Sequence, residues 1–283
     1  MPELAEVETI RQYLLPVLQG AVLEHFELRR SDLGIAEEDP LQPSDAEGCV
    51  LSAVRRKGKY LDFLFGPELH LIIHLGMSGK LIYLPPETVL EEHALYQHKH
   101  THAVWHFSSG SLLFNDVRRF GSLSLYKAAP GSLVPPLAKL GPDALSDSLT
   151  ADYLFAEKKR HPKLTVKGFL LDQHIIAGLG NIYTDEILYA ARIRPDSRMK
   201  RLSRKDLQKI LRECRRILTE AIACGGTTFR DYRNALDHQG AYQKKLSVYG
   251  RAGVPCPSCG RALESKTIAG RHSVFCRHCQ IRK

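Results

Sequence analysis

The spacing of apolar residues predicts one helix and then a long series of strands in the first half of the chain. Val7, Ile10 and Leu14 recur at helical spacing, which predicts a helix from Glu3 to about Leu18 whose end is weakened by Pro16. Short runs rich in β-branched and aromatic residues follow, separated by Gly, Pro and Ser. They predict strands at 50–55, 60–65, 69–75, 103–107 and 112–114. Several strands at such spacing favour a sandwich or a barrel.

The second half of the chain has a helical period. A segment rich in proline and glycine at 128–136 is interpreted as a linker. Helices are predicted at 164–173, 181–190 and 203–223, and the last carries one continuous apolar stripe. Ser203 with Asp206 resembles a capping box at its start, and Gly225-Gly226 ends it. The fold class is therefore predicted as α+β with several domains.

The charge of the chain is unevenly distributed. Residues 1–150 hold 13 basic and 19 acidic residues, a formal charge of −6, whereas residues 151–283 hold 27 and 12, a charge of +15. A basic half indicates a polyanionic partner, and nucleic acid is the leading interpretation because no lipidation signal or amphipathic membrane anchor is visible. No apolar run is long enough to span a membrane, and the N-terminus lacks a signal-peptide pattern. We expect a cytoplasmic protein with no membrane partner.

Four of the seven cysteines form two C-x-x-C pairs separated by sixteen residues, namely Cys256 with Cys259 and Cys276 with Cys279. This spacing predicts a zinc ribbon in which four thiolates hold one structural Zn²⁺, with no coordination position left for catalysis. A redox-active dithiol is the alternative. Lys266, Arg271 and His272 lie between the pairs and are expected to place cations at the tip of a hairpin.

Glycines at positions 178 and 180 lead into the helix predicted at 181–190. Backbone N–H groups at such a helix start suit a phosphate, and Asn181 adds a side-chain donor. An ordinary helix-loop-helix remains the alternative. A second cluster, the histidines at 93, 98, 100, 102 and 106, invites a metal interpretation. The competing interpretation is that His98, His100 and His102 share one face of a strand.

The N-terminus itself carries candidate chemistry. Removal of Met1 would leave Pro2 as a secondary amine, and an α-amino group with a pKa of about 7.7–8.0 is partly neutral near pH 7. A neutral amine can attack a sugar C1′ and form a Schiff base. Glu3 and Glu6 lie beside it and suit a general acid and base. The alternative is that these glutamates only favour a helix N-terminus.

Six motifs occur together and in order along the chain. They are Met-Pro-Glu-Leu-Ala-Glu-Val-Glu-Thr at the start, Arg-Lys-Gly-Lys-Tyr at 56–60, His-Leu-Gly-Met-Ser-Gly at 74–79, Asn-Asp-Val-Arg-Arg-Phe-Gly at 115–121, Ala-Gly-Leu-Gly-Asn-Ile-Tyr at 177–183, and the cysteine ribbon. In this set the chain resembles the formamidopyrimidine-DNA glycosylases, the oxidised-purine branch of the Fpg/Nei family. The resemblance spans almost the whole chain.

The resemblance implies an architecture and an activity. It implies an N-terminal catalytic β-sandwich domain with a leading helix at 1–132, a helix-two-turn-helix DNA-binding domain at 133–245 and a zinc finger at 246–283. It implies a monomeric bifunctional DNA glycosylase and AP lyase that excises 8-oxoguanine and formamidopyrimidines from damaged double-stranded DNA in base excision repair. The protein would be bacterial in type and associated with the nucleoid through DNA.

The resemblance also implies roles for individual residues. Pro2 matches the nucleophile, Glu3 the acid for base loss and Glu6 its supporting carboxylate. The phosphate-gripping set, of which Lys59 is also counted as catalytic, comprises Lys59, His74, Asn181 and Arg271. Met77, Arg118 and Phe120 match the side chains that fill the gap left by the flipped nucleotide, and Lys163 is assigned to DNA binding. The loop opened by residues 225–228 and running to about Tyr242 is expected to cover the extruded base.

One position departs from the family pattern. The family reads Pro-Glu-Leu-Pro-Glu at the N-terminus, and this chain has Ala5 where that proline stands. Proline fixes φ near a helix start, so we expect Ala5 to loosen Glu6 without removing a reactive group. Two other functions stay open: an endonuclease VIII-like glycosylase for oxidised pyrimidines, and a catalytically silent protein that binds DNA through the ribbon. Leu4 favours the purine branch over the first of these.

Overall fold

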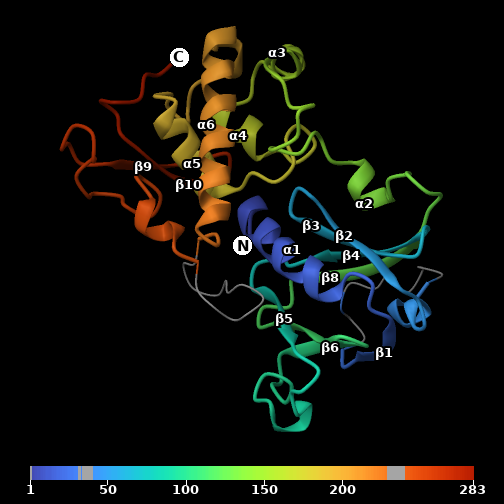
Figure 1. Cartoon of the computed structure of the whole chain (residues 1–283). Coiled ribbons are helices and arrows are strands. Elements are labelled where there is room, and N and C mark those ends of the chain that lie inside the picture. The colour runs from blue at the N-terminus through green and yellow to red at the C-terminus, as the bar shows by residue number, and fades with distance from the viewer. Residues whose placement is uncertain (1, 31–32, 34–40, 228–239) are drawn as a thin grey trace. The chain divides into compact units, whose positions relative to one another are not determined.

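The computed structural model describes residues 2–30, 33, 41–227 and 240–283 (Figure 1). They form two units, one of Met1–Ala138 with the described part of Cys224–Ala241, the other of Lys139–Ala223 with Tyr242–Lys283. The chain therefore returns to the first unit late in the sequence. Within the described ranges, no helix has both the length and the apolar character needed to cross a bilayer.

Two four-stranded antiparallel sheets form the first unit (Figure 1). One sheet has the order β1-β6-β7-β5 and the other β2-β3-β4-β8. The strands are β1 (Leu23–Leu28), β2 (Leu51–Lys57), β3 (Tyr60–Phe65), β4 (Leu69–His74), β5 (Gly79–Leu84), β6 (Thr101–Phe107), β7 (Gly110–Asp116) and β8 (Ser122–Lys127). The predicted sandwich is confirmed, and its five predicted strands are β2, β3, β4, β6 and β7. Strands β1, β5 and β8 were not predicted.

Side chains from both sheets share one apolar core. Phe63 and Phe65 of one sheet and Trp105 and Phe114 of the other are all almost fully buried in it. Helix α1 (Leu4–Leu18) completes this core, because its apolar stripe belongs to the same cluster and the helix packs on β2 and β3. Pro16 lies in the last turn and does not end the helix before Leu18. Packing of the stripe thus holds the N-terminus of the chain on the sandwich.

The second unit is built from helices. They are α3 (Ala151–Arg160), α4 (Val166–Leu171), α5 (Asn181–Ala190) and α6 (Arg204–Ala223), while the short α2 (Pro135–Ala138) belongs to the first unit at the end of the predicted linker. The capping box of α6 is confirmed. Ser203 donates its N–H and its hydroxyl to Asp206 Oδ2 over 2.9 and 2.7 Å, and the Asp206 N–H donates to Ser203 Oγ over 3.2 Å. Helix α3, which carries few apolar residues, was missed.

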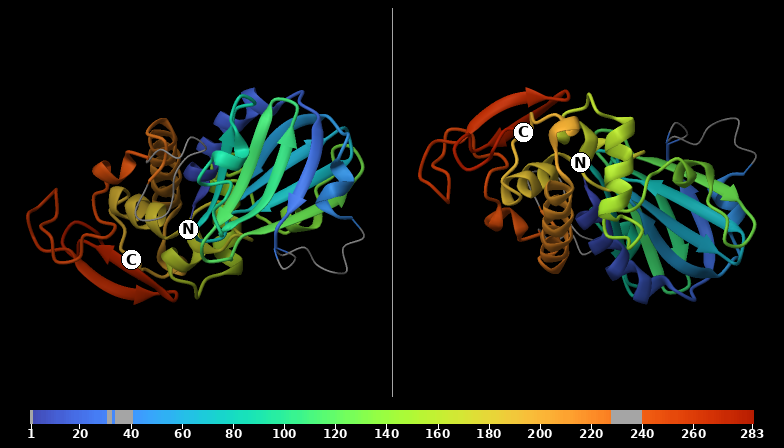
Figure 2. Two further views of the ribbon diagram at one scale, coloured as in Figure 1. Left: turned by 90° about the horizontal axis from the view of Figure 1, so that it is seen from below. Right: turned by 90° about the horizontal axis from the view of Figure 1, so that it is seen from above.

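The C-terminal tail of this unit contains the predicted ribbon hairpin, drawn in red in Figure 2. Strand β9 (Glu264–Ile268) pairs with β10 (Arg271–Phe275). Ala269 and Gly270 join them with φ of 51° and 70°, the left-handed conformation that a tight two-residue hairpin turn requires. Strand β10 packs on helix α5.

Buried polar side chains of α5 fix the hairpin in place. Asp185 Oδ1 lies 2.7 Å from Lys167 Nζ, with both side chains fully buried, and Asp185 Oδ2 accepts the Val274 N–H of β10 over 3.0 Å. Burial raises the pKa of Asp185 to about 6, although the Lys167 ammonium acts against this. Lys167 Nζ also donates to the carbonyl of His272 over 3.3 Å. One ion pair thus links α4, α5 and β10.

The expected strand face of three histidines is wrong. His98 and His100 precede β6, in a turn that the Thr101 N–H closes by donating to the His98 carbonyl over 2.8 Å. Side chains alternate between faces only along an extended strand, so this turn removes the regular spacing. His102 lies in β6, and its Nε2 is 2.7 Å from the Asp116 carbonyl oxygen.

Candidate functional site

The start of α1 holds two buried carboxylates directly after Pro2. Glu3 and Glu6 are 2 % and 1 % exposed, and Pro2 is buried as well. Glu6 Oε2 accepts the Glu3 N–H and Glu6 Oε1 accepts the Thr227 N–H, each over 2.8 Å. Gly226, with φ of 80°, packs so closely that a Cβ there would lie 3.0 Å from Glu6 Oε1. Both oxygens of Glu6 are therefore used to fix backbone.

Ala5 does not leave Glu6 without support. It is the second residue of α1 and is completely buried. Its carbonyl accepts the Thr9 hydroxyl over 2.8 Å. Because two N–H donors already hold the Glu6 carboxylate, the conformational restriction of a proline at position 5 is not what fixes it.

Lys59 lies in the turn between β2 and β3 and is only 7 % exposed. An ion pair ties this turn to α1, because Arg56 Nε lies 2.8 Å from Glu8 Oε2 and Arg56 Nη1 donates to the Gly58 carbonyl over 3.1 Å. Burial opposes ionisation of Glu8, but hydrogen bonds from Arg11 and Arg56 lower its pKa. Glu8 thus has a structural task that its sequence position alone did not reveal.

His74 ends β4 beside the Lys59 turn. Its ring packs against Tyr60 at a tilt of 40° with centroids 4.6 Å apart, and its Nδ1 accepts the Gly76 N–H over 3.2 Å. Burial lowers the His74 pKa to about 4, assisted by the positive charge of Lys59. The imidazole is therefore neutral near pH 7, with its proton on Nε2, where it can donate to a phosphate oxygen.

Two loops of the sandwich expose large side chains. Met77 and Phe120 are 37 % and 57 % exposed, which is unusual for residues of their size and apolar character. The Arg118 guanidinium lies over the Phe120 ring, 5.1 Å from its centroid. The structure therefore brings together three residues to which the family resemblance gives one role.

The remaining DNA-binding candidates lie in the second unit. Asn181 is the first residue of α5, and its Nδ2 donates to the His272 carbonyl over 3.0 Å while its Oδ1 is buried. Arg271 is exposed at the start of β10, next to the hairpin turn. Lys163 is exposed in the turn between α3 and α4, and its carbonyl accepts Arg198 Nη1 over 2.6 Å. The contact through His272 links Asn181 to the strand that carries Arg271.

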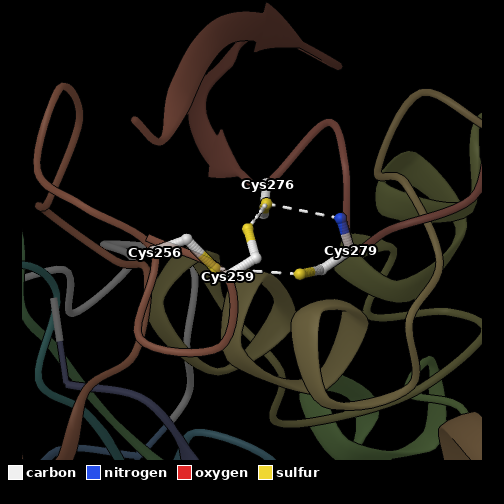
Figure 3. A group of neighbouring side chains, drawn as sticks. All are labelled: Cys256, Cys259, Cys276 and Cys279. Atoms are coloured by element: carbon white, nitrogen blue, oxygen red, sulfur yellow. Dashed lines mark hydrogen bonds between the residues drawn. The ribbon is translucent and has the colours of Figure 1, made fainter. Parts of the chain in front are cut away.

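The four predicted zinc ligands converge in one cluster (Figure 3). Sγ of Cys256 lies 3.9 Å from that of Cys279, Sγ of Cys259 lies 3.6 Å from that of Cys276, and all four sulfurs lie within 4.8 Å of one another. Tetrahedral coordination with Zn–S bonds of about 2.3 Å requires sulfurs about 3.8 Å apart. The cluster therefore fits a structural zinc, which would tie the hairpin base to the preceding knuckle.

Helix α5 also supports this cluster. The Tyr189 hydroxyl lies 3.3 Å from Cys256 Sγ and 2.7 Å from Ser258 Oγ. Burial acts to raise the pKa of Cys256, but hydrogen bonds from Tyr189 and from the N–H groups of Ser258 and Cys259 lower it to about 6. A thiolate is the form that binds zinc.

Comparison with known families matches three successive parts of the chain. Residues 1–123 match the formamidopyrimidine-DNA glycosylase N-terminal domain, residues 140–233 the formamidopyrimidine-DNA glycosylase H2TH domain, and residues 253–281 the zinc finger found in FPG and IleRS. A formamidopyrimidine-DNA glycosylase of Stenotrophomonas maltophilia (strain K279a) is 44 % identical over 99 % of this chain and 100 % of its own length.

The chain belongs to the formamidopyrimidine-DNA glycosylase family. A relative from Desulfitobacterium hafniense (strain DSM 10664 / DCB-2) is 38 % identical, again over 99 % of this chain and 100 % of its own. The MutM (Fpg) crystal structure from Thermus thermophilus matches with a TM-score of 0.84 at 35 % identity, covering 99 % of this chain and 98 % of that one. A Lactococcus lactis FPG variant in complex with Fapy-dG-containing DNA matches with a TM-score of 0.86 at 31 % identity, covering 99 % of each chain. The predicted family, enzyme class and structural zinc are confirmed.

Several residues that shape the site were not singled out from the sequence. Thr227 holds Glu6 through its backbone N–H, which no side-chain pattern reveals. Arg56 and Glu8 connect segments 48 residues apart, and their opposite charges are the only sequence signal for that pairing. The expected loop over the extruded base falls mainly on residues 228–239, outside the described residues.

Neutral His74 predicts a pH dependence of folding. Its pKa is about 4 in the folded chain against 6.5 when unperturbed, so between these values only the unfolded chain takes up the proton. This contribution to stability is complete above pH 6.5 and is lost as the pH falls towards 4. We expect His74→Gln to flatten the decline in unfolding free energy over that window. Urea denaturation followed by Trp105 fluorescence measures this, and a His74 ring titrating near 6.5 by NMR would contradict it.

The zinc cluster predicts that DNA affinity and sandwich stability respond separately to metal loss. Chelation or Cys256→Ser should abolish DNA binding, because metal binding and folding of such a small ribbon are one equilibrium. Trp105, the single tryptophan, is fully buried in the sandwich and should keep its emission. Fluorescence anisotropy with labelled duplex measures the first effect, and Cys224→Ser, outside the cluster, is the matched control. Full affinity of metal-free protein would refute the prediction.

Proposed function

We propose that this chain excises oxidised purines from duplex DNA and then cleaves the strand, with the amine of Pro2 as the nucleophile. The observation that carries the proposal is the burial of Pro2 next to the carboxylates of Glu3 and Glu6 at the start of α1. Carboxylates are rarely buried without a task, and here one is used to fix the backbone beside the amine. The Lactococcus lactis relative bound to Fapy-dG-containing DNA supports oxidised purines as the substrate class.

The chemistry follows from the groups present. Once Met1 is removed, the Pro2 nitrogen attacks C1′ of the damaged nucleotide, and the bond from C1′ to the base breaks. Glu3 acts as the acid in this sequence: the leaving base and the ring oxygen each take up a proton, and the Pro2 nitrogen gives up its own. Opening of the sugar ring then leaves an iminium, the cationic form of an imine, between Pro2 and C1′. Successive β- and δ-elimination then break the C3′–O and C5′–O bonds, and water releases the sugar fragment. Glu6, whose oxygens both accept N–H groups, positions this end of the chain.

Access to C1′ requires the nucleotide to leave the helix, at a cost of a few kcal/mol. Met77 and Phe120 supply apolar surface to support the opened stack, and Arg118 supplies donors for the orphaned base. The residues proposed to bind the phosphates around the flipped nucleotide are Lys59, His74, Lys163, Asn181 and Arg271. Neutral His74 contributes a hydrogen bond there instead of a charge.

We also propose that the protein acts as a monomer in the cytoplasm, associated with the nucleoid through its DNA substrate. The formal charge of +15 on residues 151–283 supports electrostatic attraction to that polyanion. The bounds 1–132, 133–245 and 246–283 are proposed for the catalytic, helix-two-turn-helix and zinc-finger domains.

The nucleophile is tested by borohydride trapping on duplex containing 8-oxoguanine. Sodium borohydride should reduce the imine and join the enzyme to DNA through residue 2. An extra residue before Pro2 should abolish trapping, because it converts the reactive amine into an amide. The same residue added after Lys283 is the matched control and should leave trapping intact. An adduct formed by the chain with blocked Pro2 would mean that another amine, a lysine or the α-amine of the added residue, can serve as the nucleophile, and would overturn the proposal.

The role of Glu3 is tested by separating the two chemical steps. Glu3→Gln should lower excision of 8-oxoguanine by about 100-fold or more, the usual contribution of a positioned general acid. It should retain much of the cleavage at a preformed abasic site, where the ring-opened aldehyde is already available. Glu24→Gln, an exposed change on β1, is the control. Equal losses on both substrates would show that Glu3 serves another step.

A further inference from the structure

The two loops that expose Met77 and Phe120 are both crossings between the sheets of the sandwich. The loop at 75–78 leads from β4 to β5, and the loop at 117–121 leads from β7 back to β8. Strand β4 pairs with β8 in one sheet, and β5 pairs with β7 in the other. The two crossings therefore lie side by side at one edge of the sandwich, and we call them the crossing loops.

The crossing loops touch through their backbones. A Cβ on Gly76 would lie 2.3 Å from the carbonyl carbon of Phe120, and Gly76 itself has φ of 59°. A Cβ on Gly121 would lie 2.4 Å from the Phe114 ring. Such distances leave no room for a side chain at either glycine. The close approach of the two loops depends on Gly76, and Gly121 lets its loop pass over the Phe114 ring.

A buried carboxylate joins the crossing loops. Asp116 is completely buried, and its Oδ1 accepts the hydroxyl of Ser78 over 2.6 Å and the Arg118 N–H over 3.2 Å. Its Oδ2 accepts the Gly121 N–H over 2.8 Å. Ser78 Oγ also accepts the Arg118 N–H, over 3.0 Å. One side chain thus links the last residue of β7 to both ends of its own loop and to the neighbouring loop.

These hydrogen bonds surround a backbone conformation that needs support. Arg119 has φ of 60°, a conformation that non-glycine residues adopt at a cost of about 1 kcal/mol or more. The Asp116 carboxylate accepts N–H groups on either side of it. The backbone of Asp116 is held as well, because its N–H donates to the His100 carbonyl over 2.9 Å and its carbonyl oxygen lies 2.7 Å from His102 Nε2.

We propose that Asp116 and Ser78 are positioning residues that lock the crossing loops together, so that their exposed side chains enter the DNA stack as one preformed wedge. Met77 stands next to Ser78 on one loop, and Arg118 with Phe120 stands close to Asp116 on the other. A wedge that is rigid before it meets DNA loses little conformational entropy on insertion, which lowers the cost of opening the stack. The inference rests on the proposed function, since it explains why excision from duplex DNA would be efficient.

The test compares a substrate that needs the wedge with one that does not. The first is duplex DNA with 8-oxoguanine opposite cytosine, and the second is an abasic site in a single-stranded oligonucleotide, which has neither a stack to open nor an orphaned base. We expect Ser78→Ala and Asp116→Asn each to lower kcat/KM on the duplex by about 10- to 100-fold. Cleavage of the single-stranded site should stay within about twofold of wild type.

Two further readouts distinguish positioning from a general structural defect. The difference in activity between opposite bases should become smaller in both variants, because each change weakens or removes one of the two acceptors of the Arg118 N–H. Stack opening, followed through the fluorescence of 2-aminopurine beside the lesion, should slow. The matched controls are Ser111→Ala on β7 and Asp62→Asn on β3, which remove a hydroxyl and a carboxylate that are also buried in the sandwich. Neither should change the ratio of the two activities.

Each outcome decides the proposal. Unchanged duplex activity in both variants, or an equal loss on both substrates, would overturn it. If Asp116→Asn does not fold, as judged by Trp105 fluorescence, Ser78→Ala decides, since it removes one oxygen and leaves the Asp116 carboxylate in place. A wild-type protein inactive on both substrates would refute the proposed function together with this inference, whereas an active wild type with unaffected variants would refute the inference alone.

Discussion

The hydrogen bonds of one buried carboxylate fix the start of the chain, where the proposed nucleophile lies. Glu6 accepts N–H groups from Glu3 and from Thr227, residues far apart in the sequence. A nucleophile at the chain terminus is the least constrained residue of any protein, because chain ends fray unless they are tied down. Glu6 removes that freedom while α1 is anchored in the sandwich core. The Glu6 hydrogen bonds and the packing of α1 together hold the residues next to Pro2, and the buried carboxylate is satisfied by two backbone N–H groups.

Buried carboxylates also hold other segments of the chain together. Asp116 joins the crossing loops, Asp185 joins α4 and α5 to the ribbon, and Glu186 accepts the N–H groups of Ser247, Val248 and Tyr249 on the chain that leads into the ribbon. Apolar packing of similar volume is often more stabilising than buried charge. Hydrogen bonds, however, fix direction and register, which apolar contact does not. The buried acids lie where functional side chains must be placed accurately, while the centre of the sandwich is apolar.

Much of the fold was readable because its apolar pattern is strong. The stripe of α6 and the runs of β3 and β4 predicted their elements almost to the residue. Strand β8 alternates buried and half-buried positions over most of its length, yet it follows a loop rich in charge. Strand β5 begins with Gly79, where a side chain would clash with the Leu75 carbonyl of the preceding turn. Helix α3 was missed because only Leu154 and Glu157 of its residues are buried, so it lacks an apolar stripe. The local signals of α3 are the Thr150 cap and charges of favourable sign at its two ends, which an apolar pattern does not register.

The residues of the candidate site likewise fall into those that the sequence revealed and those that it did not. Residues with unusual chemistry for their position, such as four paired cysteines or a proline after Met1, were visible in the sequence, and the resemblance supplied roles for the rest. Residues whose role lies in a contact with a distant part of the chain were not visible. Ser78 and Thr227 look like ordinary small polar residues, and only the structure shows that one meets Asp116 and the other Glu6. Asn181 was predicted only in part. Its motif predicted a helix start, but not the hydrogen bond from its side chain to the His272 carbonyl, which joins that helix start to the ribbon hairpin. This hydrogen bond holds Asn181 to the strand that carries Arg271, and Tyr189 of the same helix contacts Cys256 of the cysteine cluster, so α5 connects both DNA-binding candidates to the ribbon.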